Sequence, residues 1–259
     1  MTISTKMKNE IASYNDKQRS NKKMLYEDVY GRIRFDNART VIAFPGTKED
    51  CGYDIDTILR NDTVPHDGHF IFVENGSSLR GHGGVRDWKG YCTDLYDRKY
   101  SFLANKHYFF DNLTSLERGF MKERGVGKAD LAMLDICGMF TKDMRKWIYN
   151  KLFTICRDGA DVFFTFNLLG PLRNKNKDWS DFAELDDEWN CKYFGKIVAS
   201  YGFRDTDSQG TKEYWDSLFQ ILNWIDAGCG GRLFINNVYV YKEVGGGSNV
   251  MSLIHTTVQ

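Results

Sequence analysis

The chain has 259 residues, of which 42% are hydrophobic, 15% aromatic and 27% charged, the composition of a folded protein with a substantial core. Its 35 Lys and Arg residues balance its 35 Asp and Glu residues, so no global field draws the chain to nucleic acid or to an acidic membrane. No apolar run approaches the roughly 18 residues of a spanning helix, and the opening residues lack a secretory signal, so we expect a cytoplasmic protein with no membrane partner.

The N-terminal stretch is locally basic. Within its first 34 residues, eight Lys and Arg face four Asp and Glu. We assign residues 1–38 to a basic N-terminal helical arm and residues 39–259 to one α/β domain. The arm is either a solvated face or a contact for nucleic acid, a polyanion.

Four apolar runs predict buried strands, at residues 40–44, 69–73, 130–135 and 161–169. The three prolines of the chain lie where such elements begin or end. None of the runs alternates cleanly between apolar and polar residues. Continuous apolar strands are typical of a parallel sheet that is covered on both faces. A shorter run at 107–110 has the same character.

Apolar stripes at three- and four-residue spacing predict helices between the strands. Thr141 caps one that Gly159 closes, and further stripes span residues 53–59, 189–201 and 215–225. Two regions look irregular. The glycine-rich stretch 75–100 predicts a long binding loop or lid, and the polar block 171–188 predicts a surface loop.

The end of the chain changes character. Residues 233–242 and 249–258 are rich in branched and aromatic side chains, and they flank a glycine tract, which predicts an antiparallel β-hairpin. The expected fold is therefore α/β, with a Rossmann-like, mostly parallel sheet, helices on both faces and a C-terminal antiparallel β-hairpin.

The six cysteines show no CxxC pair and no zinc-type Cys-His spacing, so we expect reduced, mostly buried thiols. His66 and His69 lie across a turn rather than at a helical ligand spacing, which favours surface histidines. The sequence therefore predicts no metal site.

Candidate functional residues follow the predicted strands, where ligands of open α/β sheets bind. Glu74 stands at the end of the second strand, the place where Rossmann-like folds put the carboxylate that accepts two ribose hydroxyl hydrogens. The other candidates end the first, second, third and fourth runs: Pro45, Gly46 and Thr47; Asn75; Asp111; and Asp135.

This order of a glycine turn, an acid after each of three further strands and a final hairpin resembles the class I S-adenosylmethionine-dependent methyltransferases. The resemblance covers about residues 39–258. It implies S-adenosylmethionine as cofactor, with Gly46 at its methionine part, Glu74 at the ribose, Asp111 near the adenine and Asp135 at the methyl-transfer edge. Pro45, Thr47 and Asn75 are further candidates for binding the cofactor.

Two functions are compatible with these features. The first is a methyltransferase of unknown acceptor, nucleic acid being one candidate, in which Asp135 orients the acceptor or takes its proton. The second is a catalytically inactive methyltransferase-like module for binding or assembly. The first turn has only two glycines, Gly46 and Gly52, which suits the second function.

Overall fold

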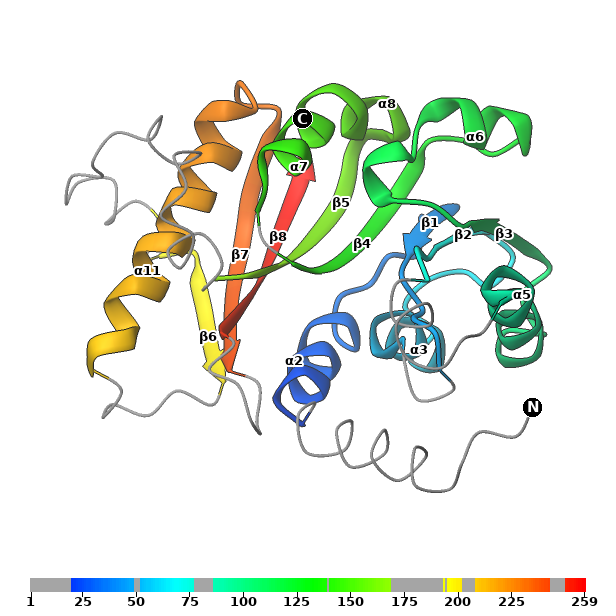
Figure 1. The fold of residues 1–259 in the computed structure, drawn as a ribbon, viewed down its shortest axis with the longest axis horizontal. Helices are drawn as coiled ribbons and strands as arrows, with labels where there is room; N and C mark the ends of the chain where they lie inside the picture. The colour runs from blue at the N-terminus through cyan, green and yellow to red at the C-terminus, as the bar shows by residue number, and fades with distance from the viewer. Residues whose placement is uncertain are drawn as a thin grey trace.

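The computed structural model describes residues 20–48, 52–76, 86–138, 140–168, 193, 195–201, 208–242 and 250–259. Its strands form one eight-stranded sheet in the order β3-β2-β1-β4-β5-β8-β7-β6, which crosses the molecule from β6 at one end to β3 at the other (Figure 1). The strands are β1 (Thr40–Ala43), β2 (His69–Val73), β3 (Asn105–Phe109), β4 (Ala129–Gly138), β5 (Cys156–Asn167), β6 (Ile197–Tyr201), β7 (Leu233–Lys242) and β8 (Val250–Val258).

The sheet is parallel from β3 to β5, and its last strand breaks the pattern. β1 pairs in parallel with β2 and with β4, and β4 pairs in parallel with β5. β8 lies between β5 and β7 and is antiparallel to both. The predicted mostly parallel sheet and its C-terminal antiparallel hairpin are therefore confirmed.

Helices cover both faces of this sheet. One face carries α2 (Ser20–Tyr30), α3 (Tyr53–Arg60) and α5 (Trp88–Lys99). The other carries η1 (Leu113–Ser115), α6 (Arg118–Glu123), α7 (Lys142–Trp147), η2 (Ile148–Leu152), α8 (Phe153–Ile155), α11 (Ser208–Asn223) and η4 (Trp224–Gly228). Among the described residues, no helix has the length and apolar character needed to cross a membrane.

Successive strand residues feed two core clusters, one on each face. In β1, Ile42 packs into the cluster under α6–α11, whereas Val41 and Ala43 pack into the cluster under α2, α3 and α5. In β4, Ala132 likewise packs into the first of these clusters and Leu131 into the second. Burial on both faces is why these strands read as continuous apolar runs.

Three local predictions were wrong. The stripe 189–201 is not a helix at its described end, because Ile197–Tyr201 is β6 and pairs in parallel with β7. Residues 88–99 are not loop but α5, whose N-cap, Asp87, accepts a hydrogen bond from the Gly90 amide. Gly159 does not end a helix: α8 stops at Ile155, and Gly159 lies within β5 at φ 80°.

The helix α2 belongs to the core of the described structure. Its side chains Leu25, Tyr26, Val29 and Tyr30 are each at most 1% exposed, and it packs on α3 and β7. The division of the chain at residue 38 stays a prediction. Residues 1–19 and the polar block 171–188 lie outside the described residues.

Candidate functional site

The sheet order brings the predicted site residues to one edge. Because β2, β1 and β4 are neighbours and parallel, Glu74 and the Gly46 turn follow adjacent strands at the same edge of the sheet. Asp135 was predicted to end the fourth strand, but β4 continues to Gly138, so Asp135 lies within β4, just past Leu134, where the pairing of β4 with β5 is interrupted. Asp111 follows β3, at the outer end of the same row.

The turn after β1 is tightly folded. Gly46 has a φ of 74°, which glycine adopts without strain, and its carbonyl accepts a hydrogen bond of 2.5 Å from the Tyr96 hydroxyl. Gly52, at φ 83°, approaches so closely that a Cβ there would lie 2.7 Å from the Pro45 carbonyl oxygen. Pro45 and Thr47 are buried, so the turn offers a ligand mainly backbone groups.

Glu74 is fixed by its own turn. Its Oε1 accepts hydrogen bonds from the backbone amides of Asn75, at 2.8 Å, and Gly76, at 2.9 Å. Burial raises the pKa of Glu74, and these two hydrogen bonds act in the opposite direction. Oε2 accepts from none of the described residues, so one carboxylate oxygen is available to a diol. Asn75 is exposed.

Two aromatic side chains lie close to these acids: one contacts Gly76, two residues after Glu74, and the other directly precedes Asp111. A Cβ at Gly76 would lie 2.3 Å from the Trp88 ring, so the indole covers this glycine. Trp88 meets Phe110 edge to face, with ring centroids 5.7 Å apart. Asp111, the next residue, is exposed and accepts a hydrogen bond from the Asn112 amide. Sequence reasoning missed Trp88 because its helix was predicted to be loop.

Asp135 forms an ion pair with a residue of the helix α2, which precedes the first strand. The ammonium of Lys22, on α2, lies 2.5 Å from Asp135 Oδ2, and the two side chains are 12% and 16% exposed. The pair joins positions 113 residues apart, so no local sequence signal could have revealed it.

A second carboxylate lies close to this pair. Asp54, on the first turn of α3, is 2% exposed; its Oδ1 accepts from the Ile55 amide, and its Oδ2 has no hydrogen-bond partner among the described residues. Burial raises the pKa of Asp54 to about 7; the negative charge of Asp135 adds to this rise and Lys22 opposes it. Asp54 was not among the predicted site residues, since an acid in a first helical turn is ordinary.

The strand order decides the fold. A last strand inserted antiparallel beside the fifth parallel strand is what the resemblance to class I methyltransferases required, and β8 occupies that place. The chain has the class I methyltransferase fold.

Comparison with known proteins finds likeness among solved structures, all at low sequence identity. No family model and no curated protein matches the sequence. A proposed hemolysin of Streptococcus thermophilus superposes with a TM-score of 0.50 at 14% identity, over 93% of this chain and 66% of that one. A proposed hemolysin of Lactococcus lactis superposes with a TM-score of 0.47 at 11% sequence identity, over 94% of this chain and 89% of that one. TYW2 of M. jannaschii, in complex with AdoMet, superposes with a TM-score of 0.44 at 9% sequence identity, over 95% of this chain and 80% of that one.

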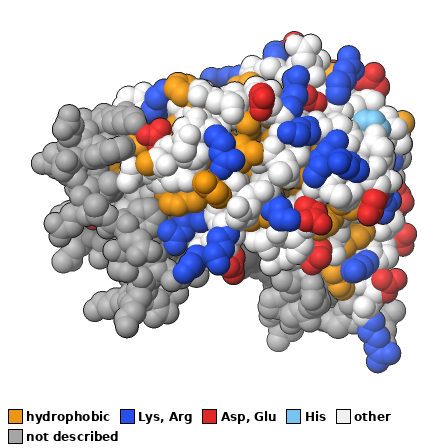
Figure 2. Space-filling model, turned by 90° about the horizontal axis from the view of Figure 1, so that it is seen from above, with side chains coloured by type: hydrophobic (Ala, Val, Ile, Leu, Met, Phe, Trp, Pro, Cys, Tyr) orange, Lys and Arg blue, Asp and Glu red, His pale blue; other side chains and the backbone are white. Residues whose placement is uncertain are grey.

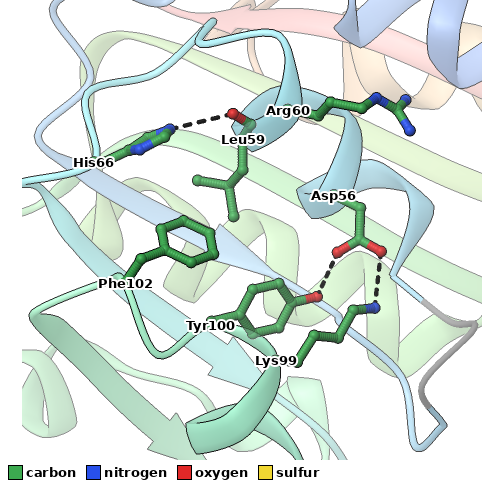
Figure 3. Close-up of a pocket in the computed structure, with 7 residues that line it drawn as sticks. All are labelled: Asp56, Leu59, Arg60, His66, Lys99, Tyr100 and Phe102. Atoms are coloured by element: carbon green, nitrogen blue, oxygen red, sulfur yellow. Dashed lines mark hydrogen bonds and ion pairs between the residues drawn. The ribbon is translucent and has the colours of Figure 1, made fainter.

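A separate cavity of about 280 Å³ opens between α3 and α5 (Figure 3). Most of its residues end these helices or precede β2, so it lies toward the amino ends of the strands, away from the edge that carries Glu74 and the Gly46 turn. Within it, Asp56 accepts from the Tyr100 hydroxyl at 2.9 Å and pairs with Lys99 at 2.8 Å. The lining residues are Asp56, Leu59, Arg60, His66, Lys99, Tyr100 and Phe102.

Several histidines and cysteines make contacts within the fold or are buried in it. His66 lies 3.2 Å from the Leu59 carbonyl oxygen, and His69 lies 3.0 Å from His107. Among the described residues, no group of three potential ligands could hold a metal ion. Burial raises the pKa of the Cys92 thiol to about 11 and of the Cys156 thiol to about 12, which makes both poor nucleophiles.

Basic side chains in the described part of the arm bind the chain itself. Besides Lys22, Arg32 pairs with Asp28 at 2.8 Å, and Arg34 donates to the Asp62 carbonyl at 2.7 Å. The face seen from above, over α6 to α8, mixes Lys and Arg with Asp and Glu side chains (Figure 2). A nucleic-acid contact through the arm therefore stays a prediction.

Proposed function

We propose that the protein is an S-adenosylmethionine-dependent methyltransferase. One observation carries the proposal: in this strand order, Glu74 ends β2 beside the glycine turn of β1, with one carboxylate oxygen open to a ribose diol. A carboxylate at that place binds ribose hydroxyls in Rossmann-like folds.

The residues at this edge fit the cofactor part by part. The turn of Pro45, Gly46 and Thr47 would hold the methionine part through its backbone, and Glu74 and Asn75 would hold the ribose. The Trp88 and Phe110 rings, with Asp111 next to them, would offer apolar contacts to the adenine. When bound, the cofactor supplies a methyl group on a positively charged sulfur.

The protein contributes mainly alignment to the methyl transfer. Asp135 lies near the carboxyl end of β4, and Lys22 fixes its carboxylate in one orientation. We assign to Asp135 the role of orienting the methyl acceptor. Holding two reactants in line replaces a bimolecular encounter and lowers the barrier without covalent chemistry by the protein.

Thermal unfolding with S-adenosylhomocysteine tests this function. The melting temperature should rise with ligand concentration, because a ligand that binds only the native state stabilises it by about 2.7 kcal/mol at a hundredfold excess over Kd. Glu74→Gln should lose most of this shift, because a charged hydrogen bond to the ribose contributes roughly 1.5–3 kcal/mol. Asp135→Asn should retain the shift.

The matched control is Glu117→Gln, which removes a surface carboxylate that pairs with Lys151, on the other face of the sheet. It should respond to the ligand like the wild type. A wild-type protein whose melting temperature does not move in millimolar ligand would exclude the methyltransferase and favour the binding module.

A further inference from the structure

Two tyrosines at the end of α5 reach the loop that connects β1 to α3. Tyr96 and Tyr100 are four residues apart, so their side chains leave the same face of the helix. They are 1% and 2% exposed, and both rings pack on Phe72 of β2, with centroids 5.5 and 5.0 Å from the Phe72 centroid. Packing on a strand of the sheet fixes where both hydroxyl groups lie.

Each hydroxyl group holds a different end of this loop. Tyr96 donates to the Gly46 carbonyl at 2.5 Å, where the chain leaves β1. Tyr100 donates to Asp56, in the first turn of α3, at 2.9 Å. A Cβ at Gly52, the N-cap of α3, would lie 3.0 Å from the Tyr100 hydroxyl oxygen, so this hydroxyl also touches the loop backbone. The helix α5 therefore fixes the loop at both ends.

The hydrogen bond from Tyr96 determines how the turn after β1 presents its backbone. A peptide unit is planar and trans, so its C=O and N–H point in opposite directions. The peptide between Gly46 and Thr47 has its carbonyl turned to Tyr96, and it cannot rotate without losing this hydrogen bond. Because Pro45 and Thr47 are buried, the backbone is the main part of the turn that a ligand can contact.

We propose that Tyr96 is a positioning residue for the methionine part of S-adenosylmethionine; this inference rests on the proposed function. Gly46, at φ 74°, belongs to a residue type that moves between backbone conformations at little cost. A contact from outside the turn must therefore select one conformation, and the Tyr96 hydroxyl supplies it. The turn is then in its binding conformation before the cofactor arrives, which lowers the cost of binding.

Tyr96 acts through the turn and not by touching the cofactor, since its side chain is buried. A purely structural role would weaken binding of all parts of the cofactor alike. A positioning role confines the loss to the methionine part. The ribose is unaffected, because Glu74 is fixed by the amides of its own turn, Asn75 and Gly76.

Calorimetric titration with two ligands separates these roles. S-adenosylhomocysteine carries the amino-acid part, whereas methylthioadenosine has the same adenosine and sulfur without it. In Tyr96→Phe, the affinity for S-adenosylhomocysteine should fall about five- to tenfold, the effect of one lost hydrogen bond. The affinity for methylthioadenosine should not change.

The matched control is Tyr108→Phe. The Tyr108 ring belongs to the same aromatic group, with its centroid 5.9 Å from that of Tyr96, but its hydroxyl donates to Asp97 at 2.5 Å. This variant loses a tyrosine hydroxyl without losing a contact to the turn, so it should bind both ligands like the wild type.

Two further replacements of Tyr96 make the test independent of one variant. Tyr96→4-fluorophenylalanine fills the space of the hydroxyl without a donor, so it should behave like Tyr96→Phe and serves if that variant does not fold. Tyr96→4-aminophenylalanine restores an N–H donor at the same place and should recover the affinity for S-adenosylhomocysteine. A variant with the amino group that binds as weakly as Tyr96→Phe would overturn the positioning role.

The outcomes also separate this inference from the proposed function. If the wild type binds neither ligand, the methyltransferase itself fails. If the wild type binds both, and Tyr96→Phe weakens both by the same factor or weakens neither, the tyrosine is structural and only the positioning role fails.

Discussion

Asp54 makes the stability of the protein depend on pH. Burial raises its pKa in the folded protein to about 7, from an ordinary value of 3.8. Below about pH 4 the carboxyl is protonated in both states. Between about pH 4 and 7 the unfolded chain releases its proton while the folded protein holds it, so the contribution of Asp54 to stability falls as the pH rises through this window.

Asp54→Asn should abolish that dependence, because the amide does not titrate. Relative to this variant, the wild type should lose on the order of 3 kcal/mol between pH 4.5 and 8, at about 1.4 kcal/mol per pH unit. Urea unfolding of both proteins across this range measures the difference. Asp56→Asn, which leaves Asp54 in place, should follow the wild-type slope. Parallel curves for the wild type and Asp54→Asn would contradict the prediction.

At the level of single residues, the sequence predicts positions better than partners. Glu74 could be placed directly after a strand because an apolar run marks that strand, whereas β4 continues three residues past Asp135, where the run was expected to end. The contact of Lys22 with Asp135 could not be predicted, since it depends on how α2 crosses the sheet. Asp54 is equally hidden, because burial of its carboxyl follows from the packing of α2 on α3.

The loop between β1 and α3 depends on glycine for two separable reasons. Gly52 needs a positive φ, and it also lacks room for a side chain beside Pro45. Gly125, after α6, has a similar φ of 67°, but a Cβ there would meet nothing within 4 Å. The two glycines therefore share a positive φ, but only at Gly52 would a side chain also clash with neighbouring atoms.

Gly125→Ala should cost about 1–2 kcal/mol, the penalty for a left-handed backbone. Gly52→Ala should cost roughly 1–3 kcal/mol more because of the clash. It should also weaken binding of S-adenosylhomocysteine, since the Pro45–Thr47 turn must move. Urea unfolding and calorimetry measure the two effects. Equal costs would show that the loop gives way easily and that only φ matters.

At the level of elements, the errors have one cause. The predicted helix 189–201 rested on apolar residues at three- and four-residue spacing, and a four-residue spacing is also compatible with one face of a strand. Residues 197–201 form a strand because their backbone pairs with β7, which would otherwise be the unpaired edge of the sheet. The helix α5 was hidden for another reason: of its 12 residues only Cys92, Leu95 and Tyr96 are buried, which is too few for a clear stripe.

The whole molecule is held together by its sheet. The core cluster under α2, α3 and α5 and the one under α6 to α11 do not share helices, but both include residues of the central parallel strands β1, β2, β4 and β5. This connection could be foreseen from the continuous apolar runs. Loss of either cluster removes one of the two layers that shield the same backbone from water.

We therefore expect one cooperative unfolding transition for the described domain. Leu25→Ala, in the first cluster, and Ile148→Ala, in the second, each empty a fully buried site and should cost roughly 2–5 kcal/mol. Both should lower a single melting temperature, by about 2–4 °C per kcal/mol for a domain of this size. Circular dichroism at far- and near-ultraviolet wavelengths should report coincident midpoints in each variant. If Leu25→Ala instead split the transition in two, α2 would be a separate folding unit docked on the sheet, and the contact of Lys22, near its N-terminal end, with Asp135 would open without unfolding the protein.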